Sequence, residues 1–263
     1  MGRTLLAGVA MAAVVLGGHG AAAGASPRPA AAQPRPAVAE PRPAVPVATA
    51  SAPAGVADDL ECLRLRGARA CVGPDGSERP GITIEDTAND HYHPAVEYYL
   101  NGYLGTKYVI HNTGRKGAVR GTREIGRVVT FRAAIYNGDR RVKYGKWKTV
   151  HDMTKYPVKR QTRVTPAAAR ARSKTCTSTK GAATLCFGGR DTFVFACDTR
   201  ADRRQARAEY YVAGDPTARF EIHQLAGTNT CGKAEHGELR ISMYRASVFN
   251  GNQRIATRLY KYN

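Results

Sequence analysis

The chain has 263 residues and a formal net charge of +19, with 40 Lys and Arg against 21 Asp and Glu. Its longest apolar stretch, residues 5–16, is shorter than the roughly 20 residues that cross a bilayer as a helix, so we expect no membrane-spanning helix. The excess of positive charge instead favours a partner that carries negative charge.

Residues 1–25 have the layout of a cleavable secretory signal, with a basic start, an apolar stretch and then small residues. We therefore expect a secreted, extracellular protein. Residues 26–56 are rich in Ala and Pro with scattered Arg, a composition that favours extended chain and cannot form a core. This segment is expected to be a disordered linker.

The remaining sequence contains a partial copy of itself. Residues 86–142 read again as residues 198–255, most clearly where FRAAIYNGDRRV matches YRASVFNGNQRI. A feature kept in both copies weighs more than one seen once. The repeat predicts two tandem domains, residues 57–165 and residues 172–263.

Six cysteines in an exported chain favour disulfide bonds. The first two recur in the second copy as the third and fourth, so each copy is expected to carry a short-loop bridge. The last two have no counterpart in the first copy and are most simply partners. Free or intermolecular thiols are the alternative, and zinc ligation is disfavoured because no Cys-x-x-Cys spacing occurs. The expected pairs are Cys62–Cys71, Cys176–Cys186 and Cys197–Cys231.

Short strands are predicted throughout both copies, separated by Gly, Asn, Asp and Pro. The clearest element is a hairpin over residues 128–144 that bends at Asn137-Gly138, and Asn250-Gly251 repeats this turn signal. Only residues 166–174 suggest a helix. The pattern predicts an all-β fold in which each copy is a small β-sandwich of the immunoglobulin-like kind. Further strands are expected at residues 83–85, 95–100, 107–112, 192–196, 208–212 and 219–224.

Each hairpin has one apolar face, which we expect to point into the core if Asn and Gly form the two-residue loop. The residues on this face are Phe131, Ala133, Ile135, Val142 and Tyr144 in the first copy, and Tyr244, Ala246, Val248 and Ile255 in the second.

The opposite hairpin face alternates cations with aromatic rings and is expected to face water. Such a surface can pair with phosphates and stack on bases or sugars. The alternative is that these side chains pack across strands for stability. The candidate binding residues are Arg132, Tyr136, Arg141, Lys143 and Trp147 in the first copy, and Arg245, Phe249 and Arg254 in the second.

Two histidines, His111 and His223, are kept in both copies. A secreted hydrolase could use such a residue as general acid or base, with Glu97 or Glu209 as the second group. The alternative is a structural histidine that is hydrogen-bonded to a neighbouring carboxylate.

Metal binding is a weaker possibility. The DTxxD segments that begin at Asp86 and Asp198 could offer oxygen ligands to calcium, but Asp and Thr also form side-chain-to-backbone turns, which we favour. His91 and His93 have a spacing compatible with zinc or copper, yet the second copy lacks both. We expect no metal and no cofactor.

The DTxxD turn, the Tyr-rich strand and the late hairpin F/Y-R-A-x-I/V-Y/F-N-G together resemble the small secreted β-domain proteins of high-GC Gram-positive bacteria. The resemblance covers both copies but not the linker. It implies an exported small β-domain, here as a tandem duplication, and it implies no substrate and no catalytic residue.

Positive charge is concentrated between residues 115 and 174, where the only acidic residues are Glu124, Asp139 and Asp152. Our first hypothesis is therefore a secreted, non-catalytic protein that binds an anionic polymer, such as nucleic acid or a wall polymer, or the cell envelope. The alternatives are a secreted hydrolase or nuclease toxin and a structural role in a spore or wall layer.

Overall fold

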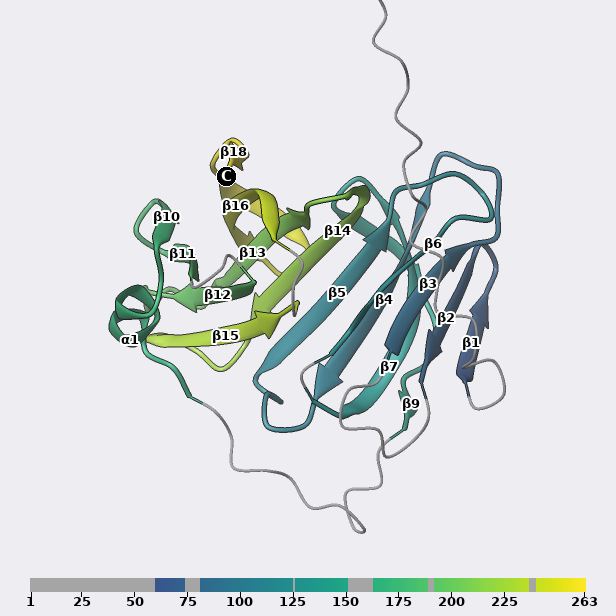
Figure 1. The fold of residues 1–263 in the computed structure, drawn as a ribbon, viewed down its shortest axis with the longest axis horizontal. Helices are drawn as coiled ribbons and strands as arrows, with labels where there is room; N and C mark the ends of the chain where they lie inside the picture. The colour runs from purple at the N-terminus through teal and green to yellow at the C-terminus, as the bar shows by residue number, and fades with distance from the viewer. Residues whose placement is uncertain (1–59, 74–80, 125, 151–162, 189–191, 237–239) are drawn as a thin grey trace, which may run out of the picture. The chain divides into compact units, whose positions relative to one another are not determined.

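The computed structural model describes residues 60–263, apart from residues 74–80, 125, 151–162, 189–191 and 237–239. The predicted signal and linker segments lie outside the described residues. The described residues belong to one compact unit, Ser51–Asn263. They form strands almost throughout, so the all-β prediction is confirmed (Figure 1). Within the described ranges no helix has the length and apolar character needed to cross a membrane.

One large sheet of ten strands runs through the two halves of the chain, which we call the N-terminal half (residues 60–150) and the C-terminal half (residues 163–263). Its strand order is β8-β7-β4-β5-β14-β13-β16-β17, with β9 on β7 and β18 on β16. The strands are β4 His93–Leu100, β5 Thr106–Asn112, β7 Val128–Asn137, β8 Arg140–Tyr144, β9 Lys148–Thr149, β13 Gln205–Val212, β14 Asp215–Gln224, β16 Ile241–Asn250, β17 Gln253–Thr257 and β18 Lys261–Tyr262.

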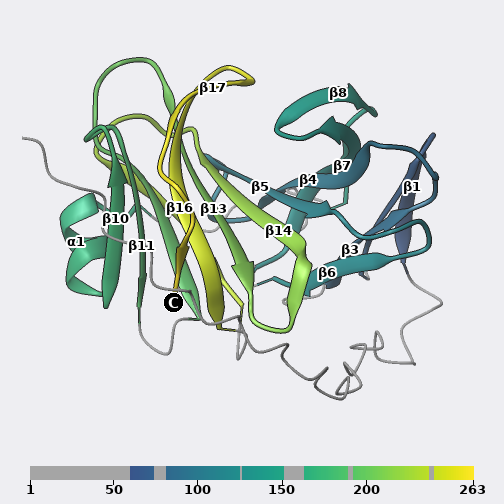
Figure 2. The ribbon, with the colours of Figure 1, turned by 90° about the horizontal axis from the view of Figure 1, so that it is seen from above.

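Two four-stranded sheets, one from each half, pack against the same face of the large sheet (Figure 2). One apolar cluster joins all three sheets, with Ile84, Tyr98, Leu185 and Phe220 among its buried members. The small sheets have the orders β1-β2-β3-β6 and β10-β11-β12-β15. Their strands are β1 Glu61–Leu65, β2 Ala68–Val72, β3 Gly81–Asp86, β6 Val119–Arg123, β10 Thr175–Thr179, β11 Ala183–Gly188, β12 Phe193–Asp198 and β15 Thr230–Glu235.

The halves meet where β5 pairs with β14 in antiparallel register. His111 lies opposite Arg219, and Lys107 lies opposite His223. The two ranges predicted as separate domains therefore share one continuous sheet. Whether each range also folds alone stays a prediction.

The three predicted disulfides are present, and no described cysteine is free. Such bonds are typical of proteins outside the reducing cytosol. The predicted helix is also present as α1 (Pro166–Ala171), in which Thr165 caps the N-terminus by accepting from Ala168 N at 3.2 Å.

The DTxxD segments form turns, as we favoured. Asp86 accepts from Ala88 N at 3.0 Å, and Asp198 accepts from Arg200 N at 3.1 Å. The later Asp of each segment makes the same kind of bond two residues ahead. The side chains thereby satisfy the backbone where the chain leaves one sheet for another.

The predicted hairpins exist, but their registers were wrong. Asn137 pairs with Arg140, so the two turn residues are Gly138 and Asp139, and Gly138 has a φ of +57°. An irregularity follows at residues 135 and 136. The extra residue turns part of β8 away from the core, and Val142 and Tyr144 are 41% and 57% exposed. The other residues predicted for the apolar faces are buried or pack against the core.

The core also holds two ionisable groups near the junction of the halves. Tyr98 Oη donates to the fully buried Glu124, and His236 Nε2 lies 2.6 Å from Tyr210 Oη. Burial raises the pKa of Glu124 to about 7 even though the bond from Tyr98 opposes this. Burial lowers the pKa of His236 to about 4. Glu124 is therefore neutral in mildly acidic solution.

Replacing Glu124 with Gln should change how stability depends on pH. The folded-state pKa of Glu124 is raised from 4.5 to about 7, so its stabilising contribution is complete below pH 4.5 and is lost as the pH rises to 7. Relative to wild type, E124Q should gain about 3 kcal/mol in free energy of unfolding over this interval. Urea denaturation of both proteins at several pH values measures the difference, in which the opposite contribution of His236 cancels. A difference that does not vary with pH would contradict the assignment.

Candidate functional site

The face of the large sheet that points away from the small sheets carries a layer of charged side chains, which we call the charged layer. Strand alternation places these residues opposite the apolar ones of the core. Most are buried, and Glu97, His111 and Glu209 have no exposed surface. The charged layer consists of Glu97, Lys107, His111, Arg132, Asp139, Arg141, Arg207, Glu209, Arg219, Glu221, His223, Arg245 and Arg254.

The prediction that this face is open to water was wrong for Arg132, Tyr136 and Phe249, which are all buried. The reason lies in the hairpins. Asp139 at the tip of the β7–β8 hairpin contacts Arg219 of β14, three strands away from β7, so the tip lies over the middle of the sheet. A hairpin that covers its own polar face removes that face from solvent.

In the N-terminal half, Glu97 forms ion pairs with three surrounding cations. We call Glu97, Lys107, Arg132 and Arg141 the N-half cluster. Arg132 donates to Glu97 Oε2 through Nε at 2.7 Å and Nη2 at 2.5 Å, and Arg141 Nη1 lies 3.0 Å from both oxygens. Lys107 Nζ follows at 3.3 Å and Tyr136 Oη at 2.5 Å. Burial would raise the pKa of Glu97, but these neighbours hold it below its ordinary value.

In the C-terminal half, Glu209, Arg219, Arg245 and Arg254 form the corresponding C-half cluster. Arg245 Nη2 and Arg254 Nη2 bind Glu209 Oε2 at 2.5 and 2.6 Å. Asp139 adds a second carboxylate, with its oxygens 3.0 Å from Arg219 Nη1 and 2.8 Å from Arg254 Nη1. The N-terminal half thus supplies an acid to the arginines of its neighbour.

Between the two clusters, Glu221 binds both of the repeated histidines. Its Oε1 is 3.1 Å from His111 Nε2, and its Oε2 is 2.7 Å from His223 Nε2. The catalytic pairs expected from the sequence, His111 with Glu97 and His223 with Glu209, are therefore not the pairs that form. Burial and nearby arginines lower the pKa of each histidine, and both side chains are enclosed. These contacts favour the alternative in which both histidines have a structural role and bind a neighbouring carboxylate.

The weak metal candidates do not come together. His93 Nε2 lies 3.0 Å from His111 Nδ1, while His91 is exposed and packs beside Tyr92. Among the described residues, one group of three acids, Asp139, Glu209 and Glu221, has oxygens within 4.8 Å of one another. Guanidinium groups already bind these carboxylates, so a metal ion would have to displace them.

Cations and aromatic rings do reach the surface at β8 and the segment that follows it. Tyr144 is 57% exposed and Trp147 is 38% exposed. Both rings also stack on Arg132, whose Cζ lies 4.6 Å from the ring centroid of Tyr144 and 4.2 Å from that of Trp147. Tyr99 packs against Trp147 at 5.3 Å between ring centroids. Arg140, Lys143 and Lys146 are exposed in the same segment of the chain, and we call these exposed residues of 140–147 the aromatic strip: Arg140, Lys143, Tyr144, Lys146 and Trp147.

The C-terminal half has a partial match, in which Arg245 Cζ lies 4.1 Å from the ring centroid of the half-buried Tyr260 and Tyr211 packs beside that ring at 5.7 Å. Phe249, the counterpart of Tyr136, is buried beneath Arg207, whose Cζ is 3.6 Å from the ring centroid. Arg245 and Arg254 are committed to Glu209 and Asp139. Of the predicted binding residues, only Lys143 and Trp147 lie on an exposed surface, and both belong to the N-terminal half.

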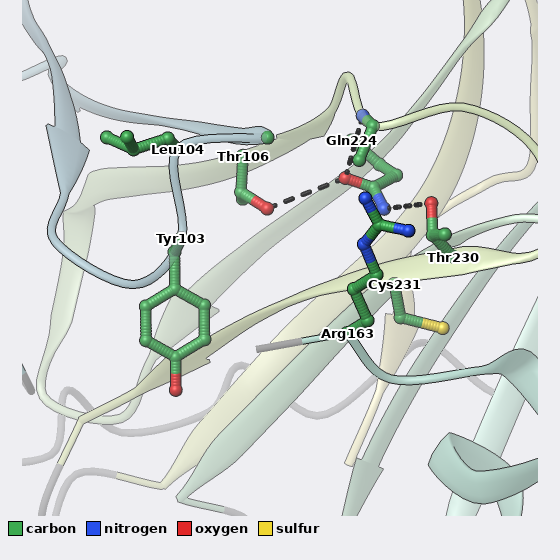
Figure 3. A pocket seen from close by; sticks show the side chains of 9 residues that line it. Tyr103, Leu104, Thr106, Arg163, Gln224, Thr230 and Cys231 are labelled. Atoms are coloured by element: carbon green, nitrogen blue, oxygen red, sulfur yellow. Dashed lines mark hydrogen bonds between the residues drawn. The ribbon is translucent and has the colours of Figure 1, made fainter. Parts of the chain in front are cut away.

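A separate pocket of about 380 Å³ lies where the β4–β5 turn meets β14 and β15 (Figure 3). Its polar centre is Gln224, which accepts from Thr106 Oγ1 at 3.5 Å and donates to Thr230 Oγ1 at 2.6 Å. Arg163 is the charged residue that lines it. Both ends of the Gln224 amide are thus engaged by neighbouring hydroxyl groups.

Several residues of the charged layer were missed by the sequence analysis, namely Lys107, Asp139, Arg207, Arg219 and Glu221. A signal was present, because a basic residue stands four positions before each repeated histidine. This pattern could not be interpreted as an ion cluster without knowing that β5 pairs with β14.

Comparison of the chain with models of known protein families gives no match, and comparison with curated protein sequences gives none either.

Replacing Glu97 with Gln should destabilise the fold strongly, because Lys107, Arg132 and Arg141 would lose the carboxylate that compensates their charge. Breaking a buried ion pair from one side costs about 3–5 kcal/mol. Glu85→Gln is the matched control, since its pair with Arg69 is partly exposed and 3.5 Å long, and should cost less than about 1 kcal/mol. Chemical denaturation measures both. Equal losses would contradict a central role for Glu97.

Proposed function

We propose that this is a secreted protein that binds an anionic polymer through the aromatic strip. The observation that carries the proposal is the arrangement of Tyr144 and Trp147, whose inner faces rest on a buried guanidinium while their outer surfaces face water. Such rings can stack on the bases or sugars of a polymer. The exposed Lys143 and Lys146 of the same segment can pair with the phosphates or carboxylates of a polymer that wraps around the edge of β8.

Rigidity supports this assignment. Arg132 stacks on both rings and is itself held by Glu97 at 2.5 and 2.7 Å. The rings therefore lose little conformational freedom when a ligand binds, which favours affinity. Within the described ranges, neither Lys143 nor Lys146 forms an ion pair with an acidic side chain.

We further propose that the halves are duplicated β-sandwich units of an exported protein. Each half contributes one four-stranded sheet and five strands of the large sheet, of which four are neighbours in the same order and the fifth, β9 or β18, is a short strand on β7 or β16. Each also places one glutamate between two arginines from a single hairpin. The signal-like segment and the disulfides support export.

A secreted hydrolase or nuclease toxin is the alternative from another class. It would need His111 or His223 to reach a substrate, and both are enclosed. Incubation of the protein with RNA, DNA and wall glycan tests it directly.

Binding is measured best through Trp147, because it is the single tryptophan of the chain. Heparin and a single-stranded oligonucleotide should change its fluorescence saturably, with affinity falling steeply as salt increases. K143E/K146E should weaken binding at least about tenfold, because two attractive charges become repulsive ones. No response to any polyanion at low ionic strength would overturn the proposal.

K174E/R200E is the control for net charge. It makes the same change at two exposed positions of the C-terminal half, and its affinity should stay near that of wild type. Tyr144→Ala then separates ligand classes. Loss of a stacking ring should weaken nucleic acid by about 1–3 kcal/mol. A polymer without bases should be affected less.

A further inference from the structure

The two clusters of the charged layer have the same architecture but different charge balance. In each, a glutamate of the large sheet faces an arginine across the strands and receives a second arginine from the hairpin, while a basic residue near the β5–β14 junction completes the set. The corresponding residues are Glu97 and Glu209, Arg132 and Arg245, Arg141 and Arg254, and Lys107 and Arg219.

The C-half cluster is completed by a carboxylate from the opposite hairpin. Asp139 contacts Arg219 and Arg254 at 3.0 and 2.8 Å, and its oxygen lies 4.0 Å from Arg245. At the equivalent place in the β16–β17 hairpin the residue is Asn252, which follows Gly251 as Asp139 follows Gly138. That hairpin also approaches the charged layer, because Gly251 O accepts from Arg207 Nη2 at 2.9 Å. It brings no carboxylate.

The N-half cluster is therefore short of negative charge. Glu97 alone faces Lys107, Arg132 and Arg141, and Arg207 lies near enough to influence Lys107 electrostatically. An excess of buried cations is costly, and a bound anion would relieve it.

The ionisation of the equivalent basic residues agrees with this difference. Burial lowers the pKa of Lys107, and repulsion from Arg207 and Arg141 adds to it despite Glu97. At Arg219, burial acts in the same direction, but Glu221, Glu209 and Asp139 outweigh it and raise the pKa. Glu97 therefore does not offset the effect of burial on the pKa of the lysine, whereas three carboxylates offset it at the arginine.

We infer that the N-half cluster binds one oxyanion group, a phosphate or carboxylate of the ligand. The group would lie at the position equivalent to that of the Asp139 carboxylate in the C-half cluster. The inference rests on the proposed function, because Arg132 links this site to the aromatic strip. Lys107, Arg132 and Arg141 keep 12%, 10% and 16% of their side chains exposed, so a small anion can approach them. Charge-assisted bonds from two guanidiniums and an ammonium would hold it.

The experiment uses the full chain with inorganic phosphate, sulfate and acetate as probes at low ionic strength. Trp147 reports on the site, because its ring lies 4.2 Å from Arg132 Cζ. Phosphate should change its fluorescence saturably. Asn252→Asp, which supplies the missing carboxylate, should weaken phosphate binding at least about tenfold. Gln253→Glu adds the same charge at the neighbouring exposed residue and should have a much smaller effect.

Asp139→Asn tests the comparison from the other side. Removing this carboxylate should open the C-half cluster, so that calorimetry finds two phosphates per chain instead of one, or so that phosphate raises the melting temperature of D139N more than that of wild type. If D139N shows neither change, Asp139 does not occupy an oxyanion site and the comparison fails.

Two results would overturn the inference outright. One is the absence of a saturable response to all three anions, and the other is an equal effect of N252D and Q253E. The proposed function has a separate outcome. If K143E/K146E abolishes polymer binding while N252D leaves it unchanged, the aromatic strip binds the polymer and the N-half cluster does not.

Discussion

The pairing of β5 with β14 determines how the charges of this protein are arranged. It places Lys107 opposite His223 and His111 opposite Arg219, so polar side chains from both halves meet on one side of one sheet. Without this junction, Glu221 would not reach His111, and Asp139 would have no arginine of the second half within reach. The ion pairs that lie within one half, such as Glu97 with Arg132 and Glu209 with Arg245, flank this contact on either side. Backbone pairing between the halves thus organises their side-chain chemistry.

Burying a layer of charged side chains has a high free-energy cost. Removing charges from water costs several kcal/mol for each ion, and their mutual attraction offsets this only where the geometry is good and hydrogen bonds are complete. Glu97 meets the condition, since both of its oxygens receive bonds from arginine. The layer as a whole contains more cations than carboxylates. Ion pairing therefore explains its cohesion but leaves positive charge uncompensated on the side of the N-terminal half.

The sequence predicted the local structure well. Its internal repeat led to the three disulfide pairs, and Asn-Gly with flanking alternation led to both hairpins. The arginines of these hairpins were misplaced, because alternation distinguishes two faces of a strand without indicating what covers the polar one. Arg132 is buried beneath Tyr144 and Trp147, and Asp139 at the hairpin tip binds Arg219, far away in the sequence. A glutamate kept with two arginines in both copies was the available sign of an ion cluster.

The edges of the large sheet show what joining the halves achieves. Its outermost path strands, β8 and β17, have five residues each, all exposed or half-buried, and each pairing with the neighbouring strand contains an irregularity. Short, twisted, charged margins resist the addition of further strands from other molecules. If β5 and β14 were unpaired edge strands, they would pair with strands of other molecules far more readily, because they are longer and largely apolar on one side. Because one polypeptide carries both strands, each covers the edge of the other, and neither edge is left open to a strand of another molecule.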